Sequence, residues 1–272
     1  MRPRSKSAGS TVSDALLRTA KLRIEVPGRV LVDEFDSAVT RGEFIALLGG
    51  NGTGKSLLLR TLAGLRVPGA GAVRLDGHDI GSLPRRSIAT RLGFLPQDPD
   101  AAPQGTLLES VKLGRYAHLG FWEPSGPQDE RRALAALADV GLDSFGAREL
   151  ATLSGGEQRR AAMARLLVQA PSVYLMDEPT NHLDPAQQIG ILERLHELTR
   201  AECAVIASLH DPNLALRFAD RLWLLSGTGK VTTVARAELE ARQLAELYGI
   251  DYAETRLGEL RFMAPGSAVR NR

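Results

Sequence analysis

Two hydrophobic patterns distinguish the strands expected in the first part of the chain. Residues 22–26 (LRIEV) and 29–35 (RVLVDEF) alternate apolar and polar side chains, which is typical of strands with one buried face. Residues 43–50 (EFIALLGG) are almost continuously apolar, as in a parallel-sheet strand that is buried on both faces. The leucine-rich residues 57–65 that follow predict a helix.

Further strand patterns recur along the rest of the chain, and helical patterns separate most of them. The expected strands lie at residues 72–77, 91–97, 172–179, 203–211 and 221–227. Strands that alternate with helices are typical of βαβ units. The sequence therefore predicts the α/β class with a mostly parallel sheet.

Residues 98–164 differ from the rest because their amphipathic helical patterns have no buried strand between them. We expect them to form a helical subdomain, inserted into an α/β core made of residues 21–97 and 165–235. Residues 1–20 are expected to be a flexible leader, because no apolar stretch follows their basic residues as in a signal peptide. Residues 236–272 predict a C-terminal helix and a loose tail.

The composition excludes several classes of protein. The 272 residues are 43% hydrophobic and 24% charged, as in a globular protein, and the net charge of +2 is too small to indicate nucleic-acid binding. The single cysteine, Cys203, cannot form an internal disulfide and fits a reducing cytosol. No stretch reaches the roughly 18 consecutive apolar residues of a membrane span. If the protein acts at a membrane, another chain must do the spanning.

The segment GGNGTGKS matches the phosphate-binding pattern G-x-x-x-x-G-K-[ST], and it has the required strand before it and helix after it. Its backbone N–H groups and the helix N-terminus are expected to point at the β- and γ-phosphates of a nucleotide. Lys55 adds a positive charge, and the Ser56 hydroxyl is a magnesium ligand. The residues expected to bind the nucleotide are Gly49, Gly50, Asn51, Gly52, Thr53, Gly54, Lys55, Ser56 and Leu57.

Four polar residues stand at the carboxyl ends of expected strands, where ligands of open α/β sheets gather. Asp177 is placed to hold a metal ion, and Glu178 follows it and can reach an attacking water. Gln97 is expected to sense the metal and the water, and His210 to contact the γ-phosphate. Taken alone, His210 could equally be a structural histidine, but the other three residues at matching strand ends favour the catalytic role.

A second glycine pair opens another expected helix, in the segment LSGGE at residues 153–157. Ser154 is a good N-cap, and Glu157 stands where a capping box needs its acid. Gly155 and Gly156, however, each cost about 1 kcal/mol of helix propensity relative to alanine. Bare amides at a helix N-terminus suit an anion, so this segment predicts a second phosphate-binding site.

With these motifs in this order, the chain resembles the nucleotide-binding subunit of ATP-binding cassette (ABC) transporters over nearly its whole length. The resemblance adds a Walker B strand at residues 173–177. It implies ATP and Mg²⁺ as cofactors, with Ser56, Gln97 and Asp177 at the metal and Glu178, Gln97 and His210 as catalytic residues. The implied fold is a P-loop NTPase core with a mostly parallel sheet, an N-terminal antiparallel β subdomain and the inserted helical subdomain.

The family also explains the second glycine pair. In such proteins two cassettes pair head to tail, and the signature segment of one closes over the ATP of the other. The resemblance therefore assigns Ser154, Gly155, Gly156, Glu157 and Asp184 to the ATP of a partner subunit. It implies a homodimer on transmembrane permease subunits at the cytoplasmic face of the inner membrane, supplied by a periplasmic or extracellular substrate-binding protein.

One departure from the family concerns the base of the nucleotide. ABC proteins usually carry an aromatic residue upstream of the phosphate loop that stacks on adenine. In this chain the position falls near Val26, and no aromatic residue lies in the stretch. We therefore expect weak selectivity for the base. Because Glu178 is present, we expect hydrolysis as well as binding.

Residues 107–122 and 210–225 are similar to the ATPases of metal-chelate importers, which carry iron–siderophores, haem or cobalamin. A plain helix end with Tyr116 packed in the core remains an alternative for the first of these segments. An ABC ATPase of iron–sulfur assembly or an exporter subunit is the alternative function. ABC ATPases that act on DNA or ribosomes carry coiled coils or two cassettes, which this chain lacks. A kinase or GTPase would leave LSGGEQ unexplained.

Overall fold

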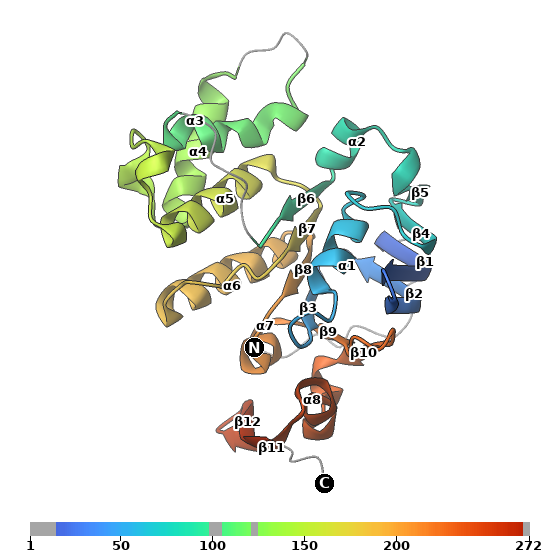
Figure 1. Ribbon diagram of the computed structural model, residues 1–272. Coiled ribbons are helices and arrows are strands. Elements are labelled where there is room, and N and C mark those ends of the chain that lie inside the picture. Colours follow the sequence, from blue (N-terminus) through green and yellow to red (C-terminus); the bar gives the residue numbers. More distant parts are fainter. Residues whose placement is uncertain (1–14, 98–104, 121–124, 269–272) are drawn as a thin grey trace.

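The computed structural model describes residues 15–97, 105–120 and 125–268. A six-stranded sheet in the order β10-β9-β3-β8-β7-β6 forms the centre. Strands β3, β6, β7, β8 and β9 are parallel, and β10 is antiparallel to β9. Its strands are β3 (Phe44–Leu48), β6 (Leu92–Leu95), β7 (Val173–Met176), β8 (Ala204–Ser208), β9 (Arg221–Leu225) and β10 (Val231–Ala235). The mostly parallel sheet predicted from the sequence is confirmed (Figure 1).

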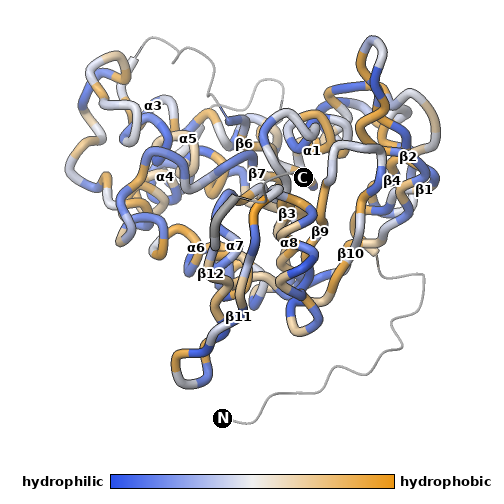
Figure 2. Tube along the Cα trace, turned by 60° about the horizontal axis from the view of Figure 1, so that its bottom comes forward, coloured by the Kyte–Doolittle hydropathy of each residue, from blue (hydrophilic) through white to orange (hydrophobic). Residues whose placement is uncertain are grey.

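The central strands divide the core into two layers, because successive side chains of a strand point to opposite faces. Every residue of β3 is buried. Phe44, Ala46 and Leu48 join one apolar cluster, whereas Ile45 and Leu47 join the other. Helices cover the sheet, among them α1 (Lys55–Leu62), α6 (Pro185–Arg200) and α7 (Pro212–Phe218). Figure 2 shows the hydrophobic stretches concentrated on the central strands.

A second, antiparallel sheet packs on the α1 side of the core, as expected for the N-terminal β subdomain. Its order is β2-β1-β4-β5, made of β1 (Ala15–Val26), β2 (Arg29–Thr40), β4 (Ala70–Leu75) and β5 (His78–Asp79). The assignment of residues 15–20 to a flexible leader is wrong, because Leu16 and Leu17 are buried and already belong to β1. The remainder of that leader, residues 1–14, lies outside the described residues.

The helical subdomain contains α3 (Leu107–Lys112), α4 (Pro127–Asp139) and α5 (Gly155–Gln169). A 3₁₀ helix, η2 (Leu113–Ala117), extends α3, and two more 3₁₀ turns, η3 (Asp143–Phe145) and η4 (Leu150–Thr152), link α4 to α5. Helix α5 continues past the expected boundary at residue 164 and ends at Gln169, with Ala170 as a C-cap whose φ of 48° is left-handed. Short elements η1 (Ile80–Ser82) and α2 (Arg85–Ala89) lead from the antiparallel sheet to β6.

The C-terminal segment is more ordered than expected. After η5 (Arg236–Glu238) and α8 (Ala241–Tyr248), the chain forms a hairpin of β11 (Ile250–Leu257) and β12 (Leu260–Ala268). The expected loose tail is therefore wrong for residues 264–268. Asn213 of α7 ties this hairpin down, because its side chain accepts from Met263 N at 2.8 Å and donates to Met263 O at 3.3 Å. A single polar side chain that bonds to the backbone of a distant strand does not change the hydrophobic pattern of the sequence, so the hairpin could not be predicted from that pattern.

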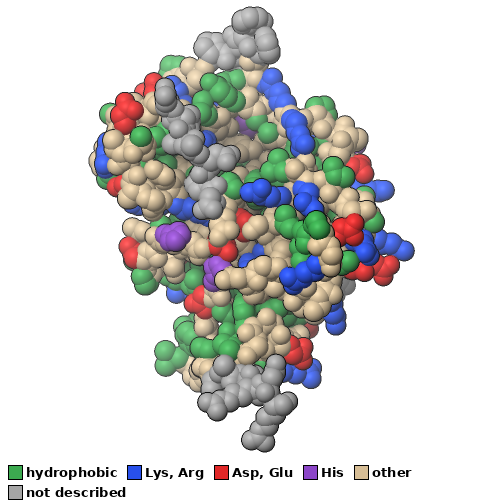
Figure 3. Space-filling model, in the orientation of Figure 1, with side chains coloured by type: hydrophobic (Ala, Val, Ile, Leu, Met, Phe, Trp, Pro, Cys, Tyr) green, Lys and Arg blue, Asp and Glu red, His purple; other side chains and the backbone are tan. Residues whose placement is uncertain are grey.

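Across the part of the chain that the structure describes, no helix is long and apolar enough to cross a membrane. Basic and acidic side chains are interspersed over the face seen in Figure 3, which fits the small net charge of the chain.

Candidate active site

The phosphate-binding loop connects β3 to α1. Gly52 and Gly54 have φ angles of 72° and 105°, in the left-handed region that glycine adopts without strain. A Cβ atom on Gly49 would lie 2.6 Å from the carbonyl oxygen of Leu225, so the loop also needs glycine in order to pack against β9. The backbone of the loop therefore requires these glycines independently of any ligand.

The Lys55 ammonium group folds back onto its own loop. Nζ donates to the carbonyl oxygens of Gly49 at 2.8 Å and Gly50 at 3.1 Å, and only 6% of the residue is exposed. Burial lowers the pKa of Lys55, and the charges of Glu178 and Asp177 oppose that shift. Because a phosphate is a stronger acceptor than a neutral carbonyl group, an anionic ligand in the loop can attract this ammonium group.

Asp177 lies at the carboxyl end of β7 and is only 1% exposed. The Ser208 hydroxyl at the end of β8 donates to Asp177 Oδ1 at 2.8 Å and accepts from the backbone N–H of Glu178 at 2.7 Å. Within the described residues, Asp177 makes no ion pair. A buried carboxylate without a paired cation is costly, so this position suits a bound metal ion.

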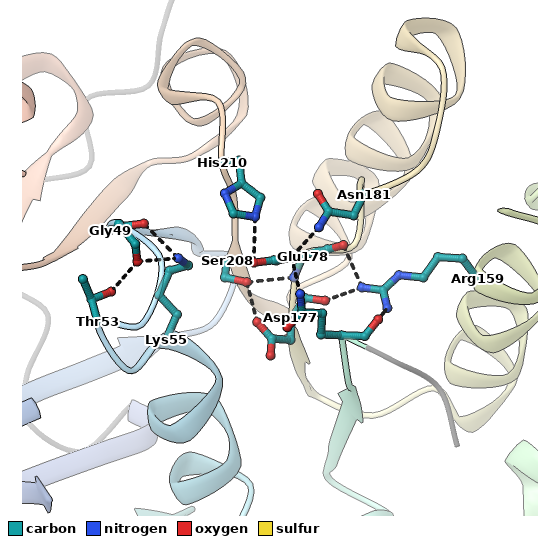
Figure 4. A network of polar contacts seen from close by, with 11 residues as sticks. Gly49, Thr53, Lys55, Arg159, Asp177, Glu178, Asn181, Ser208 and His210 are labelled. Carbon is teal, nitrogen blue, oxygen red and sulfur yellow. Dashed lines mark hydrogen bonds and ion pairs between the residues drawn. The ribbon is translucent and has the colours of Figure 1, made fainter. Parts of the chain in front are cut away.

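Three side chains contact the Glu178 carboxylate, and Figure 4 shows two of them, His210 and Asn181. His210 Nε2 lies 2.7 Å from Glu178 Oε1, and Gln97 Nε2 donates to Oε2 at 3.0 Å. The Asn181 side chain also donates to Oε2. Glu178 itself has a φ of 52°, an uncommon conformation for a residue with a side chain. The structure thus brings the three expected catalytic residues into direct contact.

Arg159 of α5 is a residue of this site that the sequence did not single out. It is 5% exposed, and its guanidinium group donates to the carbonyl oxygens of Pro96 and Glu178 at 2.7 Å each. It also donates to the carbonyl oxygens of Gln97 and Asp177. The helix that follows LSGGE is therefore tied to both strand ends that carry candidate catalytic groups. Since Arg159 stands beside the equally basic Arg160, only the structure distinguishes them.

The predicted second phosphate site has the expected local geometry. Ser154 caps α5, with its N–H donating to Glu157 Oε2 at 2.7 Å and its hydroxyl accepting from Glu157 N at 3.4 Å. The Ser154 backbone N–H, followed by its hydroxyl, lowers the pKa of Glu157. A Cβ atom on Gly155 would meet nothing within 4 Å, so no described residue packs against the position where a side chain would stand. Asp184 likewise caps α6, accepting from Gln187 N at 2.9 Å.

A cavity of about 420 Å³ extends from the phosphate loop. Lys55 and Ser56 line it together with Gln97 and Glu178, whereas Val26, Arg29 and Leu31 line it from the antiparallel sheet. The signature residues 154–157 and Asp184 are not part of this lining. Within one chain, the structure therefore joins the first set of predicted site residues and leaves the second set apart from it.

Comparison with known proteins identifies the family. The sequence model described as ABC transporter matches residues 32–181, more than half of the chain. The chain belongs to the ABC transporter family. Its curated relatives in this family include the hemin import ATP-binding protein of Rhodopseudomonas palustris, 40% identical over 242 residues that cover 83% of this chain and 86% of that protein. The petrobactin import ATP-binding protein of Bacillus anthracis is 38% identical and covers 76% of each chain.

Solved structures of ABC proteins share the fold. A metal-chelate type ABC transporter in an inward-facing conformation aligns with a TM-score of 0.79 at 24% identity, over 94% of this chain and 99% of that chain. A dimeric ATP-binding cassette in a post-hydrolysis state, bound to ADP and Pi, aligns with a TM-score of 0.73 at 28% identity, over 81% and 98%. The ABC protein described here is accordingly an ATPase with a P-loop NTPase core, as predicted from its motifs.

Proposed function

We propose that this protein hydrolyses ATP to power the import of a metal chelate, an iron–siderophore, haem or cobalamin, from the cytoplasmic face of the inner membrane. The observation that carries the proposal is the close similarity, over more than three quarters of the chain, to import ATP-binding proteins for hemin and petrobactin. A relative of Halobacterium salinarum, 37% identical, is named for cobalamin import. The cargo class is shared although the individual chelates differ.

ATP is proposed to bind with its triphosphate in the loop from Gly49 to Leu57. Lys55 then gives up its hydrogen bonds to the carbonyl oxygens of Gly49 and Gly50 and donates to the phosphates instead. The ammonium group keeps its hydrogen bonds and places its positive charge next to the ligand. Mg²⁺ fits the oxygen donors of Ser56, Gln97 and Asp177, because hard oxygen ligands suit this ion. When bound, it supplies charge neutralisation at the β- and γ-phosphates.

Glu178 is proposed as the group that orients and polarises the attacking water. In the structure its carboxylate oxygens are occupied by donors from Gln97, Asn181 and His210. A γ-phosphate would compete with Glu178 for the His210 imidazole. If the imidazole moved to the phosphate, Glu178 Oε1 would be free to contact the water. Catalytic hydrogen bonds often form only in the complex with substrate, so this exchange provides a reason why hydrolysis waits for ATP.

We further propose that two copies pair head to tail, and that Ser154, Gly155, Gly156, Glu157 and Asp184 of one copy contact the ATP of the other. Two features support this arrangement. Among the described residues, no atom lies within 4 Å of the position that a Cβ atom of Gly155 would take, and the signature residues do not line the cavity of their own phosphate loop. The dimeric cassette structures among the solved relatives have this family's fold.

The helical subdomain is proposed to carry the surface that docks on the permease. Tyr116 in η2 is 65% exposed, so the alternative in which this tyrosine packs in the core is wrong. Arg86 of α2 donates to the carbonyl oxygen of Ala117 at 3.1 Å, which places η2 at the joint between subdomain and core. A large exposed aromatic residue at such a joint suits an interface between proteins.

The function is tested by reconstituting the protein in proteoliposomes with a permease and a substrate-binding protein that co-purify with it. ATP on the side of this subunit should drive uptake of labelled ferric siderophore, haem or cobalamin into the opposite compartment. Transport in the reverse direction would identify an exporter. ATP hydrolysis that none of the chelates stimulates would overturn the assignment of metal-chelate cargo.

The docking surface is tested separately. Tyr116→Glu should weaken assembly with the permease and leave ATP binding unchanged. Leu257→Glu is the matched control, because Leu257 is 72% exposed on the hairpin at the far end of the molecule (Figure 1). If the control weakens assembly as much as Tyr116→Glu, the docking surface lies elsewhere.

A further inference from the structure

The nucleotide cavity has an unusual wall at the end away from the catalytic carboxylate. Its lining comes from the phosphate loop, from Gln97 and Glu178, and from the β1–β2 ribbon, which contributes Val26, Arg29 and Leu31. None of the described residues that line this cavity is aromatic. For a nucleotide with its triphosphate in the loop and its base at the ribbon end of this cavity, the described side chains available to the face of the base are those of Val26, Arg29 and Leu31.

Arg29 is held in place by the turn between β9 and β10. Its Nε and Nη2 atoms donate to the carbonyl oxygen of Gly227 at 3.2 Å and 2.8 Å. Gly227 has a φ of 75°, and a Cβ atom on it would lie 2.8 Å from Arg29 Nη2 and 3.1 Å from Thr53 Cγ2. The guanidinium group and Thr53 of the phosphate loop therefore both lie next to the same glycine.

This anchoring leaves part of the guanidinium group available. Arg29 is exposed, and among the described residues the hydrogen bonds of its guanidinium group come from Nε and Nη2, not from Nη1. A guanidinium group is planar, is weakly hydrated and stacks on aromatic faces. Its attraction to a π-system persists at exposed sites, and the two bonds to Gly227 reduce the side-chain entropy that stacking would otherwise cost.

We propose that Arg29 is the residue on which the base of the bound nucleotide stacks, in place of an aromatic side chain. This inference rests on the ATP-binding activity of the family and does not depend on the transported cargo. Stacking uses the face of the base and leaves its hydrogen-bonding edge unread. Arg29 therefore favours the larger purines over pyrimidines and does not distinguish adenine from guanine.

A role of Arg29 as a ligand of the phosphates is the competing explanation, because a cation near the loop could serve either end of the nucleotide. The two roles predict different effects when Arg29 is replaced by lysine or by tyrosine. Lysine keeps the charge and loses the plane, whereas tyrosine keeps a plane and loses the charge. The two roles also differ for tripolyphosphate, which has the phosphates of ATP and no base.

The experiment measures dissociation constants of ATP, CTP and tripolyphosphate by calorimetry on the full chain. Glu178→Gln is carried throughout so that hydrolysis does not consume the nucleotides. Arg29→Ala should weaken ATP binding roughly 3- to 30-fold, as expected for the loss of one cation–π contact. Arg29→Lys should weaken it by less, because lysine keeps the cation and loses the stacking plane. Both should leave tripolyphosphate within about twofold and reduce the preference for ATP over CTP. Arg29→Tyr should restore ATP binding.

Arg66→Ala provides the matched control. Arg66 is also exposed and lies near the β1–β2 turn, where it donates to the carbonyl oxygen of Glu25 at 2.7 Å. It is not among the described residues that line the nucleotide cavity. Its removal should change neither the ATP affinity nor the ratio of ATP to tripolyphosphate. Since that ratio is compared within each variant, a partial loss of folded protein does not alter it.

Two results would overturn the proposal. Equal weakening of ATP and tripolyphosphate in Arg29→Ala, with rescue by lysine and not by tyrosine, would make Arg29 a phosphate ligand. Unchanged ATP binding in all three Arg29 variants would place the base on another surface. In either case ATP binding at the phosphate loop itself would still be intact, so failure of this inference is distinguishable from failure of the ATPase assignment.

Discussion

Replacing Arg159 with alanine tests whether this buried guanidinium group holds the catalytic strands to the signature helix. Four carbonyl oxygens accept from it, and one of them, Glu178 O, also accepts from Asn181 N at 3.1 Å. The substitution therefore removes the Arg159 donor from three further carbonyl oxygens, those of Pro96, Gln97 and Asp177, which lie in buried or half-buried surroundings. An unsatisfied buried group costs roughly 1–3 kcal/mol. Partial relaxation around the gap brings the expected loss of unfolding free energy to about 3–5 kcal/mol.

Thermal unfolding followed by circular dichroism measures this loss. For domains of this size, 1 kcal/mol corresponds to roughly 2–4 °C in Tm, so Arg159→Ala should melt about 10 °C lower than the wild type. ATP turnover should fall as well, because Gln97 and Glu178 lose a common anchor. The Tm of Arg159→Lys should lie between those of the wild type and Arg159→Ala, because an ammonium group cannot reach all four carbonyl oxygens at once.

Arg160→Ala is the control for the same helix and the same charge. Arg160 donates to Val140 O at 3.1 Å and Gly141 O at 3.2 Å, both within the helical subdomain. Its loss should cost only about 1 kcal/mol and leave turnover close to normal. Equal shifts in Tm for the two variants would refute the reasoning, because the strand ends would then not depend on Arg159.

Three further predictions concern the nucleotide cycle. Glu178→Gln should retain ATP affinity and lose roughly 10²- to 10⁴-fold in turnover, the contribution of a positioned base; near-normal turnover would remove Glu178 from the mechanism. Because Val26 offers no aromatic face, GTP should compete with ATP within about tenfold in equilibrium binding, and a preference for ATP beyond a hundredfold would require another group that reads adenine. In a Cys203→Ser background, Thr53→Cys with Ser154→Cys should form an ATP-dependent disulfide between two chains, since this bond needs Cα atoms within about 7 Å; a disulfide within one chain would contradict the head-to-tail dimer.

The local patterns of the sequence determined much of this protein. Continuous apolar runs identified β3, β7 and β8, because strands covered on both faces have no polar side to display. The glycines of the phosphate loop and the Ser154 cap were equally readable, since backbone conformation and capping depend on residues close together in the chain. The order of the motifs identified the family and its ATPase activity.

Contacts between residues far apart in sequence were decided only by the tertiary structure. Arg159 meets Pro96 across 63 positions, and Arg29 meets Gly227 across 198, and in neither case does the local sequence indicate the partner. The same holds for the C-terminal hairpin, which is anchored through Asn213 and Met263, 50 positions apart. A periodic pattern records which face of an element is buried, but not what that face packs against. The roles of these residues therefore follow from the folded chain, in which loops and helices from separate segments converge on one cavity.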